Sequence, residues 1–173
     1  GANPLAALGA GFNRIKAGDP VLVDIVHVHR GYVADMTRMF SVGPLSNEWV
    51  ARLEDMNEIA MTIRYSLGCG ENCSTAWGVG AAKAEEMGHG DHLMGMAPDQ
   101  ARFLGHSIGL ELDETPVVAA GFDRPLPVGG TMAIEPKVIH RDGAIGVEDC
   151  WVRTADGMSC LSSGDDFPLW TEW

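Results

Sequence analysis

Five residues in this chain of 173 have the types and the spacing that metal chemistry requires. They are one histidine and four acidic residues, each in a short segment of its own: Asp24, Asp35, His106, Glu135 and Glu148. An imidazole and several carboxylates that can bridge neighbouring ions suit two hard divalent cations, and Mn, Co, Zn and Fe all tolerate such ligands. Two ions close together can hold a hydroxide and polarise a carbonyl, which is the chemistry of amide hydrolysis.

A β-hairpin is predicted to place the first two carboxylates near one another. Residues 21–29 and 32–42 are rich in β-branched and aromatic side chains, and the turn falls at residues 30–31. Asp24 and Asp35 are separated by 35 − 24 = 11 residues. This separation fits two side chains that face inward from opposite strands of a short hairpin.

The remaining elements predict an α+β fold. Ser46 is a plausible N-cap, and apolar residues then recur at steps of three and four until Gly68, which predicts an amphipathic helix. A second helix is predicted over residues 74–87, and the segment 131–162 is typical of a β-meander. Helices and strands in this order favour an antiparallel sheet with helices over one face.

Length and composition predict one domain over residues 1–173. The formal net charge of −12 makes nucleic acid and an anionic membrane surface unsuitable partners. No apolar run approaches the roughly 18 residues that span a bilayer. The four cysteines have neither zinc-ribbon nor CxxC spacing, so we expect reduced thiols and a cytoplasmic location.

The segments that contain the five ligand residues occur in a distinctive order. They are DIV, GYVADMTR, GHSIG, IEP and GVED. In this order and with these gaps they resemble the pita-bread family, which includes methionine aminopeptidase, aminopeptidase P, prolidase and creatinase. The resemblance extends from about residue 15 to residue 161, and it implies the C-terminal portion of the pita-bread fold. Without the N-terminal part a sheet edge would be exposed, so we expect a homodimer.

The resemblance also implies a role for each candidate residue. Asp24 would chelate the first ion, and Asp35 and Glu148 would bridge both ions. His106 and Glu135 would bind the second ion. Glu135 would also act as the general base that takes a proton from the attacking water.

Four positions depart from the pattern of active peptidases in this family. Where histidines are usual, the chain has Asp113, Arg102 and a residue near Leu8, and Gly146 replaces a usual arginine. Those histidines would donate to the scissile carbonyl and the oxyanion, and loss of one such donor costs about 100- to 1000-fold in rate. We expect Asp113 either to donate in a protonated form or to bind a cationic group of the substrate.

Three functions are compatible with these features. The leading hypothesis is a metal-dependent hydrolase resembling Xaa-Pro aminopeptidase or dipeptidase, which removes an N-terminal residue from a small peptide, with Glu135 and Asp113 as catalytic residues. The altered positions favour a creatinase-like C–N hydrolase of a small non-peptide molecule. The partial fold favours a binding module without catalysis.

Overall fold

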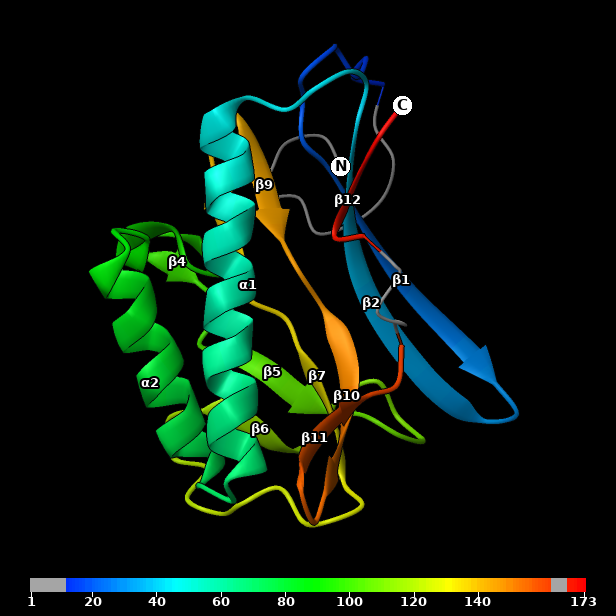
Figure 1. The fold of residues 1–173 in the computed structure, drawn as a ribbon, viewed down its shortest axis with the longest axis vertical. Coiled ribbons are helices and arrows are strands. Elements are labelled where there is room, and N and C mark those ends of the chain that lie inside the picture. The colour runs from blue at the N-terminus through cyan, green and yellow to red at the C-terminus, as the bar shows by residue number, and fades with distance from the viewer. Residues whose placement is uncertain (1–11, 163–167) are drawn as a thin grey trace.

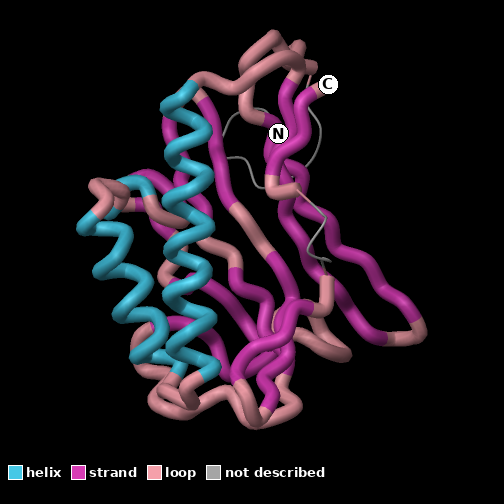
Figure 2. The backbone as a smooth tube through the Cα atoms, viewed as in Figure 1, coloured by secondary structure: helices cyan, strands magenta, loops and turns pink. Residues whose placement is uncertain are grey.

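The computed structural model describes residues 12–162 and 168–173, in which two helices lie together along one side of the strands (Figure 1). The strands form two main sheets, and the path of the backbone between them is visible in Figure 2. This architecture confirms the predicted α+β class with helices over one face of an antiparallel sheet. Among the described residues, no helix is both long and apolar enough to cross a membrane.

The predicted hairpin forms the first sheet. Its strands are β1 (Val21–His29), β2 (Tyr32–Ser41) and β12 (Trp170–Glu172), in the order β1-β2-β12. β1 and β2 are antiparallel, whereas β12 runs parallel to β2. Asp24 pairs with Thr37, two residues beyond Asp35. Because side chains two residues apart in a strand share a face, Asp24 and Asp35 are diagonal neighbours on one face of the hairpin.

The helices begin and end close to the predicted residues. They are α1 (Asn47–Gly68) and α2 (Cys73–Glu86), so the second begins and ends one residue before its prediction. Ser46 caps α1, since its side chain accepts a hydrogen bond of 3.3 Å from the backbone N–H of Trp49. The buried face of α1 includes Met56 and Ile63, which are fully buried in the main core.

The second sheet has five strands, all antiparallel to their neighbours, in the order β11-β10-β7-β5-β6. The strands are β5 (Phe103–Ser107), β6 (Glu114–Ala119), β7 (Thr131–Ile134), β10 (Asp149–Thr154) and β11 (Gly157–Cys160). The segment between α2 and β5 contains only short elements, namely η1 (Gly90–His92), β3 (Gly95–Met96) and β4 (Asp99–Gln100). All four cysteines lie among the described residues, and no disulfide joins them.

The predicted β-meander over residues 131–162 is confirmed, with one break in its first two strands. β7 is continued by β8 (Lys137–His140), and β9 (Gly143–Gly146) is continued by β10; the two pairs share one antiparallel register, in which Ile134 faces Asp149 and Lys137 faces Gly146, and β11 is the third strand. Pro136 separates β7 from β8, and its missing N–H cannot continue a strand ladder. The β8–β9 hairpin consequently reaches across to α1 and to the β1–β2 hairpin, which brings the two sheets together.

Two glycines of α2 provide a test of the helix packing. An ideal Cβ on Gly80 would lie 2.8 Å from Cγ1 of Ile63 and 3.0 Å from Cδ1 of Leu104, whereas one on Gly78 would meet nothing within 4 Å. We expect Gly78→Ala to stabilise the protein by about 0.5–1 kcal/mol, because alanine favours a helix. We expect Gly80→Ala to be destabilising, since overpacking costs about 1–3 kcal/mol. Urea denaturation measures both, and equal stabilisation by the two variants would contradict this packing.

Candidate metal centre

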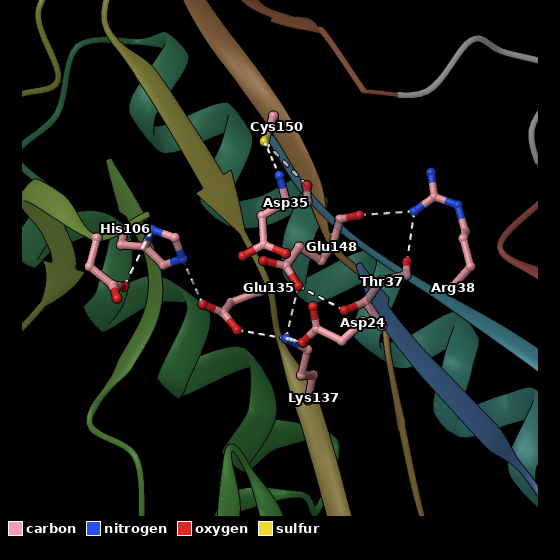
Figure 3. Close-up of polar contacts among 10 residues, drawn as sticks. Asp24, Asp35, Thr37, Arg38, His106, Glu135, Lys137, Glu148 and Cys150 are labelled. Atoms are coloured by element: carbon pink, nitrogen blue, oxygen red, sulfur yellow. Dashed lines mark hydrogen bonds and ion pairs between the residues drawn. The ribbon is translucent and has the colours of Figure 1, made fainter. Parts of the chain in front are cut away.

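The five candidate residues converge where the β1–β2 hairpin meets the five-stranded sheet (Figure 3). Asp24 lies on β1 and Asp35 on β2, while His106 lies on β5. Glu135 directly follows β7, and Glu148 directly precedes β10. The structure therefore gathers all five side chains of the predicted ligand set, from segments far apart in the sequence, around one point.

Glu148 is fixed through both its main chain and its side chain. The backbone N–H of Thr37 donates to the Glu148 carbonyl at 3.3 Å, and the Thr37 hydroxyl donates to Oε2 of Glu148 at 2.7 Å. The buried guanidinium of Arg38 donates to the same carbonyl at 2.9 Å and to Oδ1 of Asp149 at 2.7 Å. These contacts join β2 to the start of β10 and hold the carboxylate of Glu148 in one orientation.

Cys150 holds Asp35 in a similar way. The backbone N–H of Asp35 donates to Sγ of Cys150 at 3.3 Å, and the thiol donates back to the Asp35 carbonyl at 3.2 Å. Burial raises the pKa of Cys150 to about 11, so the side chain is a neutral thiol near pH 7. A neutral thiol in this place positions the carboxylate of Asp35 and adds no negative charge to the cluster.

Two carboxylate oxygens in the cluster are buried without a hydrogen-bond partner among the described residues. They are Oδ1 of Asp35 and Oε1 of Glu148, whose residues are 6% and 1% exposed. Asp35, Glu148 and His106 each offer one ligand atom, and these three atoms lie within 4.8 Å of one another. Because an unpaired buried carboxylate oxygen is costly, a divalent cation bound here would satisfy both. The residues present therefore fit such an ion.

A lysine that the sequence analysis did not single out lies inside the cluster. Nζ of Lys137 lies 2.6 Å from Oε2 of Glu135, 2.9 Å from Oε2 of Glu148 and 3.2 Å from Oδ2 of Asp24. Burial opposes the charge on this lysine, but the three carboxylates outweigh burial and hold its pKa above its ordinary value. The sequence spacing could have predicted this position, because residues two apart in an extended segment lie on the same face, as Glu135 and Lys137 do.

The charges of the remaining groups depend on one another. Burial lowers the pKa of His106, but Nε2 lies 3.4 Å from Oε1 of Glu135, and this carboxylate raises the pKa to about 9. Burial raises the pKa of Glu135, yet His106 and Lys137 bring it below its ordinary value. Burial and the charge of Glu148 raise the pKa of Asp35 to about 7. The cluster thus carries an excess of negative charge that a divalent cation would neutralise.

Two of the four positions that depart from the family pattern, Asp113 and Gly146, lie beside residues of this cluster. Oδ1 of Asp113 is 3.6 Å from Nδ1 of His106, but the Asp113 side chain is 72% exposed, so it lies at the rim. Arg102 is exposed as well. Gly146 pairs with Lys137 across the β8–β9 hairpin. Leu8 lies outside the described residues.

Thr37 provides a test of how the cluster is supported. We expect Thr37→Val to weaken binding of Mn²⁺ by about 10- to 100-fold, because loss of an outer hydrogen bond frees a metal-ligating carboxylate. Thr62→Val is the matched control, since the Thr62 hydroxyl donates to the Glu58 carbonyl on the exposed side of α1. Titration calorimetry with Mn²⁺ measures both affinities, and a Thr37→Val affinity within twofold of the wild type would contradict this role.

The two main sheets, the helices on one face and the cluster of carboxylates with a histidine define a protein of the pita-bread class. Residues 2–155 match the model of metallopeptidase family M24. This match covers most of the chain, and the chain therefore belongs to family M24.

Relatives with similar sequences carry peptidase names. The chain is 28% identical over 152 residues to Xaa-Pro dipeptidase of Lactobacillus delbrueckii subsp. lactis, covering 87% of this chain and 39% of the relative. It is 32% identical over 152 residues to a probable dipeptidase PepE of Mycobacterium bovis, covering 86% of this chain and 38% of the relative. The chain thus spans less than half the length of either relative.

Solved structures agree with this fold. The X-Pro aminopeptidase of Thermotoga maritima superposes with a TM-score of 0.86 at 24% identity, over 99% of this chain and 46% of that structure. The prolidase of Pyrococcus horikoshii superposes with a TM-score of 0.81 at 25% identity, over 94% of this chain and 46% of that structure. These superpositions confirm the pita-bread fold expected from the sequence.

Proposed function

We propose that this protein is a metal-dependent hydrolase that removes the N-terminal residue from small peptides of the Xaa-Pro type. The observation that carries the proposal is a pair of buried carboxylate oxygens, one from Asp35 and one from Glu148, that lie beside His106 and have no partner among the described residues. The names of the family and of its Xaa-Pro dipeptidase relatives support the substrate class. A divalent cation bound here would act as a Lewis acid and lower the pKa of a water molecule.

The side chains in and beside the cluster have different proposed roles in the reaction. Glu135 is the proposed general base, and its Oε1 lies on the side of His106, away from the oxygen that Lys137 holds. Asp113 is proposed to bind the cationic amino terminus of the peptide, because its exposed carboxylate lies at the rim beside the imidazole. His106 orients Glu135 at 3.4 Å.

The test of this proposal is cleavage of Xaa-Pro dipeptides and short Xaa-Pro peptides by the purified protein with added Mn²⁺ or Co²⁺. We expect Glu135→Gln to lower kcat by at least about 100-fold, because general-base catalysis contributes roughly that much or more. Glu86→Gln is the matched control, since Glu86 is exposed on α2 and far from the cluster in the sequence. Undiminished turnover by Glu135→Gln would exclude this role.

Lys137 favours a second candidate, a creatinase-like hydrolase of a C–N bond in a small non-peptide substrate. Its ammonium, already surrounded by three carboxylates, gives the cluster a permanent positive charge. Full activity after removal of metal by a chelator would favour this candidate over the peptidase. Absence of turnover with every substrate tested, together with saturable ligand binding, would favour a binding module.

We also propose that the protein is a cytoplasmic homodimer that associates through the free edge of β1. β1 has a neighbour on one side only among the described strands, and Ile25, Val26 and Val28 on this strand are exposed. Light scattering coupled to gel filtration measures the mass in solution. A monomer at all concentrations, or a dimer unaffected by Val26→Lys and Val28→Lys, would exclude this interface.

A further inference from the structure

We propose that the ammonium of Lys137 takes the place of one of the two cations, so that the centre holds a single divalent ion between Asp35, His106 and Glu148. The inference rests on the proposed function and restricts its metal content. The ligand set alone predicts two ions, whereas this inference predicts one. It is based on which carboxylate oxygens contact Lys137 and which do not.

The carboxylate oxygens fall into two groups on opposite sides of the cluster. Oε2 of Glu148 accepts from both Lys137 and Thr37, whereas its Oε1 is buried and has no donor among the described residues. Oε2 of Glu135 accepts from Lys137, whereas its Oε1 faces Nε2 of His106. The lysine therefore contacts one oxygen of Glu148 and one of Glu135, and it leaves the second oxygen of each without a lysine contact.

Asp24 belongs to the side that Lys137 occupies. Its Oδ2 accepts from Nζ of Lys137 at 3.2 Å, and it is not one of the three residues whose ligand atoms lie within 4.8 Å of one another. Figure 3 shows the amino group of Lys137 beside Asp24 and Glu135, while His106 approaches from the other direction. The residue expected to chelate the first ion therefore already has a cationic partner.

The backbone opposite Lys137 is shaped to let the lysine enter. Gly146 is its pairing partner in the β8–β9 hairpin, and an ideal Cβ at this glycine would lie 2.4 Å from Cγ of Lys137 and 2.9 Å from its Cα. Any side chain at position 146 would therefore displace the stem of the lysine. The glycine that replaces the family's usual arginine is thus the residue that permits an ammonium within the cluster.

Space and charge both oppose a second ion while the lysine is present. Metal–oxygen bonds of about 2.0–2.2 Å would require a second ion to use the oxygens that Nζ contacts, and the two cations would then repel at short range. One ammonium and one divalent ion together neutralise all but one of the negative charges of the four carboxylates. Removal of the ammonium would leave both the space and the charge for a second ion.

Metal counting on the purified protein tests the inference. The protein is stripped with a chelator, dialysed against excess Mn²⁺ and analysed for bound Mn²⁺ by mass spectrometry, with electron paramagnetic resonance to separate single from coupled ions. We expect one ion for the wild type and for Lys137→Arg, and two coupled ions for Lys137→Ala. Lys83→Ala is the matched control, because Lys83 pairs with Glu58 and Glu86 on the helices and should leave the count at one.

A second variant covers the case in which Lys137→Ala does not fold in the absence of metal. Lys137→Gln keeps hydrogen-bond donors without the charge, and we expect excess Mn²⁺ to raise its Tm more than that of the wild type. Two coupled ions in the wild type would overturn the inference and leave the proposed function intact, as would one ion in a folded Lys137→Ala or an equal Tm shift. Absence of saturable binding in every variant would instead remove the metal centre on which the proposed function depends.

Discussion

His106→Ala is expected to reduce the affinity of this protein for Mn²⁺ or Co²⁺ by about 100-fold or more. Loss of a group that only supports a ligand typically costs about 10- to 100-fold, so loss of the sole imidazole of the cluster should cost at least the upper value. His106 would also add a third ligand atom to those of Asp35 and Glu148 around a bound ion. Titration calorimetry and equilibrium dialysis measure the change.

The control for this variant is another partly buried histidine with a defined partner. Nδ1 of His92 lies 2.9 Å from the Ile139 carbonyl, and its ring stacks on His140 at 4.0 Å, away from the carboxylate cluster. We expect His92→Ala to leave the metal affinity unchanged. Equal affinities for the wild type and His106→Ala would show that the ion binds elsewhere or does not need this side chain.

Arg38→Ala is expected to lower the free energy of unfolding by about 3–5 kcal/mol, because removal of one partner of a buried ion pair leaves an uncompensated charge. The side chain of Arg38 is 2% exposed, and that of its partner Asp149 is 12% exposed. The same guanidinium also donates to the carbonyls of Thr37 and Glu148. Loss of Arg38 should therefore weaken the contact between β2 and the start of β10, next to the cluster.

Urea denaturation measures this loss as a shift in the midpoint. Arg38→Lys should recover only part of it, since an ammonium cannot reproduce the forked contacts of a guanidinium. Lys83→Ala, which removes exposed ion pairs on the helices, should change the midpoint little. An Arg38→Ala midpoint as close to the wild type as that of Lys83→Ala would contradict the structural role given to this arginine.

The sequence was sufficient to predict the frame that positions the candidate ligands. Alternation and β-branched residues located the β1–β2 hairpin, and the N-cap and the apolar spacing located α1. These signals are local, because each depends on residues within one or two turns or strands. The five candidate residues also converge as predicted, since the order of the motifs indicated which segments had to meet.

Contacts between segments distant in the sequence could not be predicted in this way. The predicted meander forms, but the break at Pro136 and the packing of β8 and β9 against α1 depend on contacts with a distant helix, which a strand pattern does not contain. Lys137 resembles an ordinary strand residue until the hairpin register places it opposite Gly146. Gly146 appeared as a lost arginine in the sequence, whereas in the structure it makes room for a different cation.

Lys137 also changes how the departures from the family pattern are understood. Asp113 lies at the exposed rim beside His106, where it is proposed to bind the substrate, and Arg102 is exposed as well. Lys137 and Gly146 lie inside the cluster and act together, because the glycine gives the lysine its path. The exposed departures and those inside the cluster therefore involve different residues, and each group can be tested by its own variants.

Anomalous diffraction from crystals of the protein soaked in Mn²⁺ is the most direct test of the proposed centre. We expect one anomalous peak, within bonding distance of Asp35, His106 and Glu148, with Nζ of Lys137 still in contact with Asp24. Absence of a peak in the cluster, or a peak on the side of Asp24 with Lys137 displaced, would contradict the proposal that these residues form a single-ion centre.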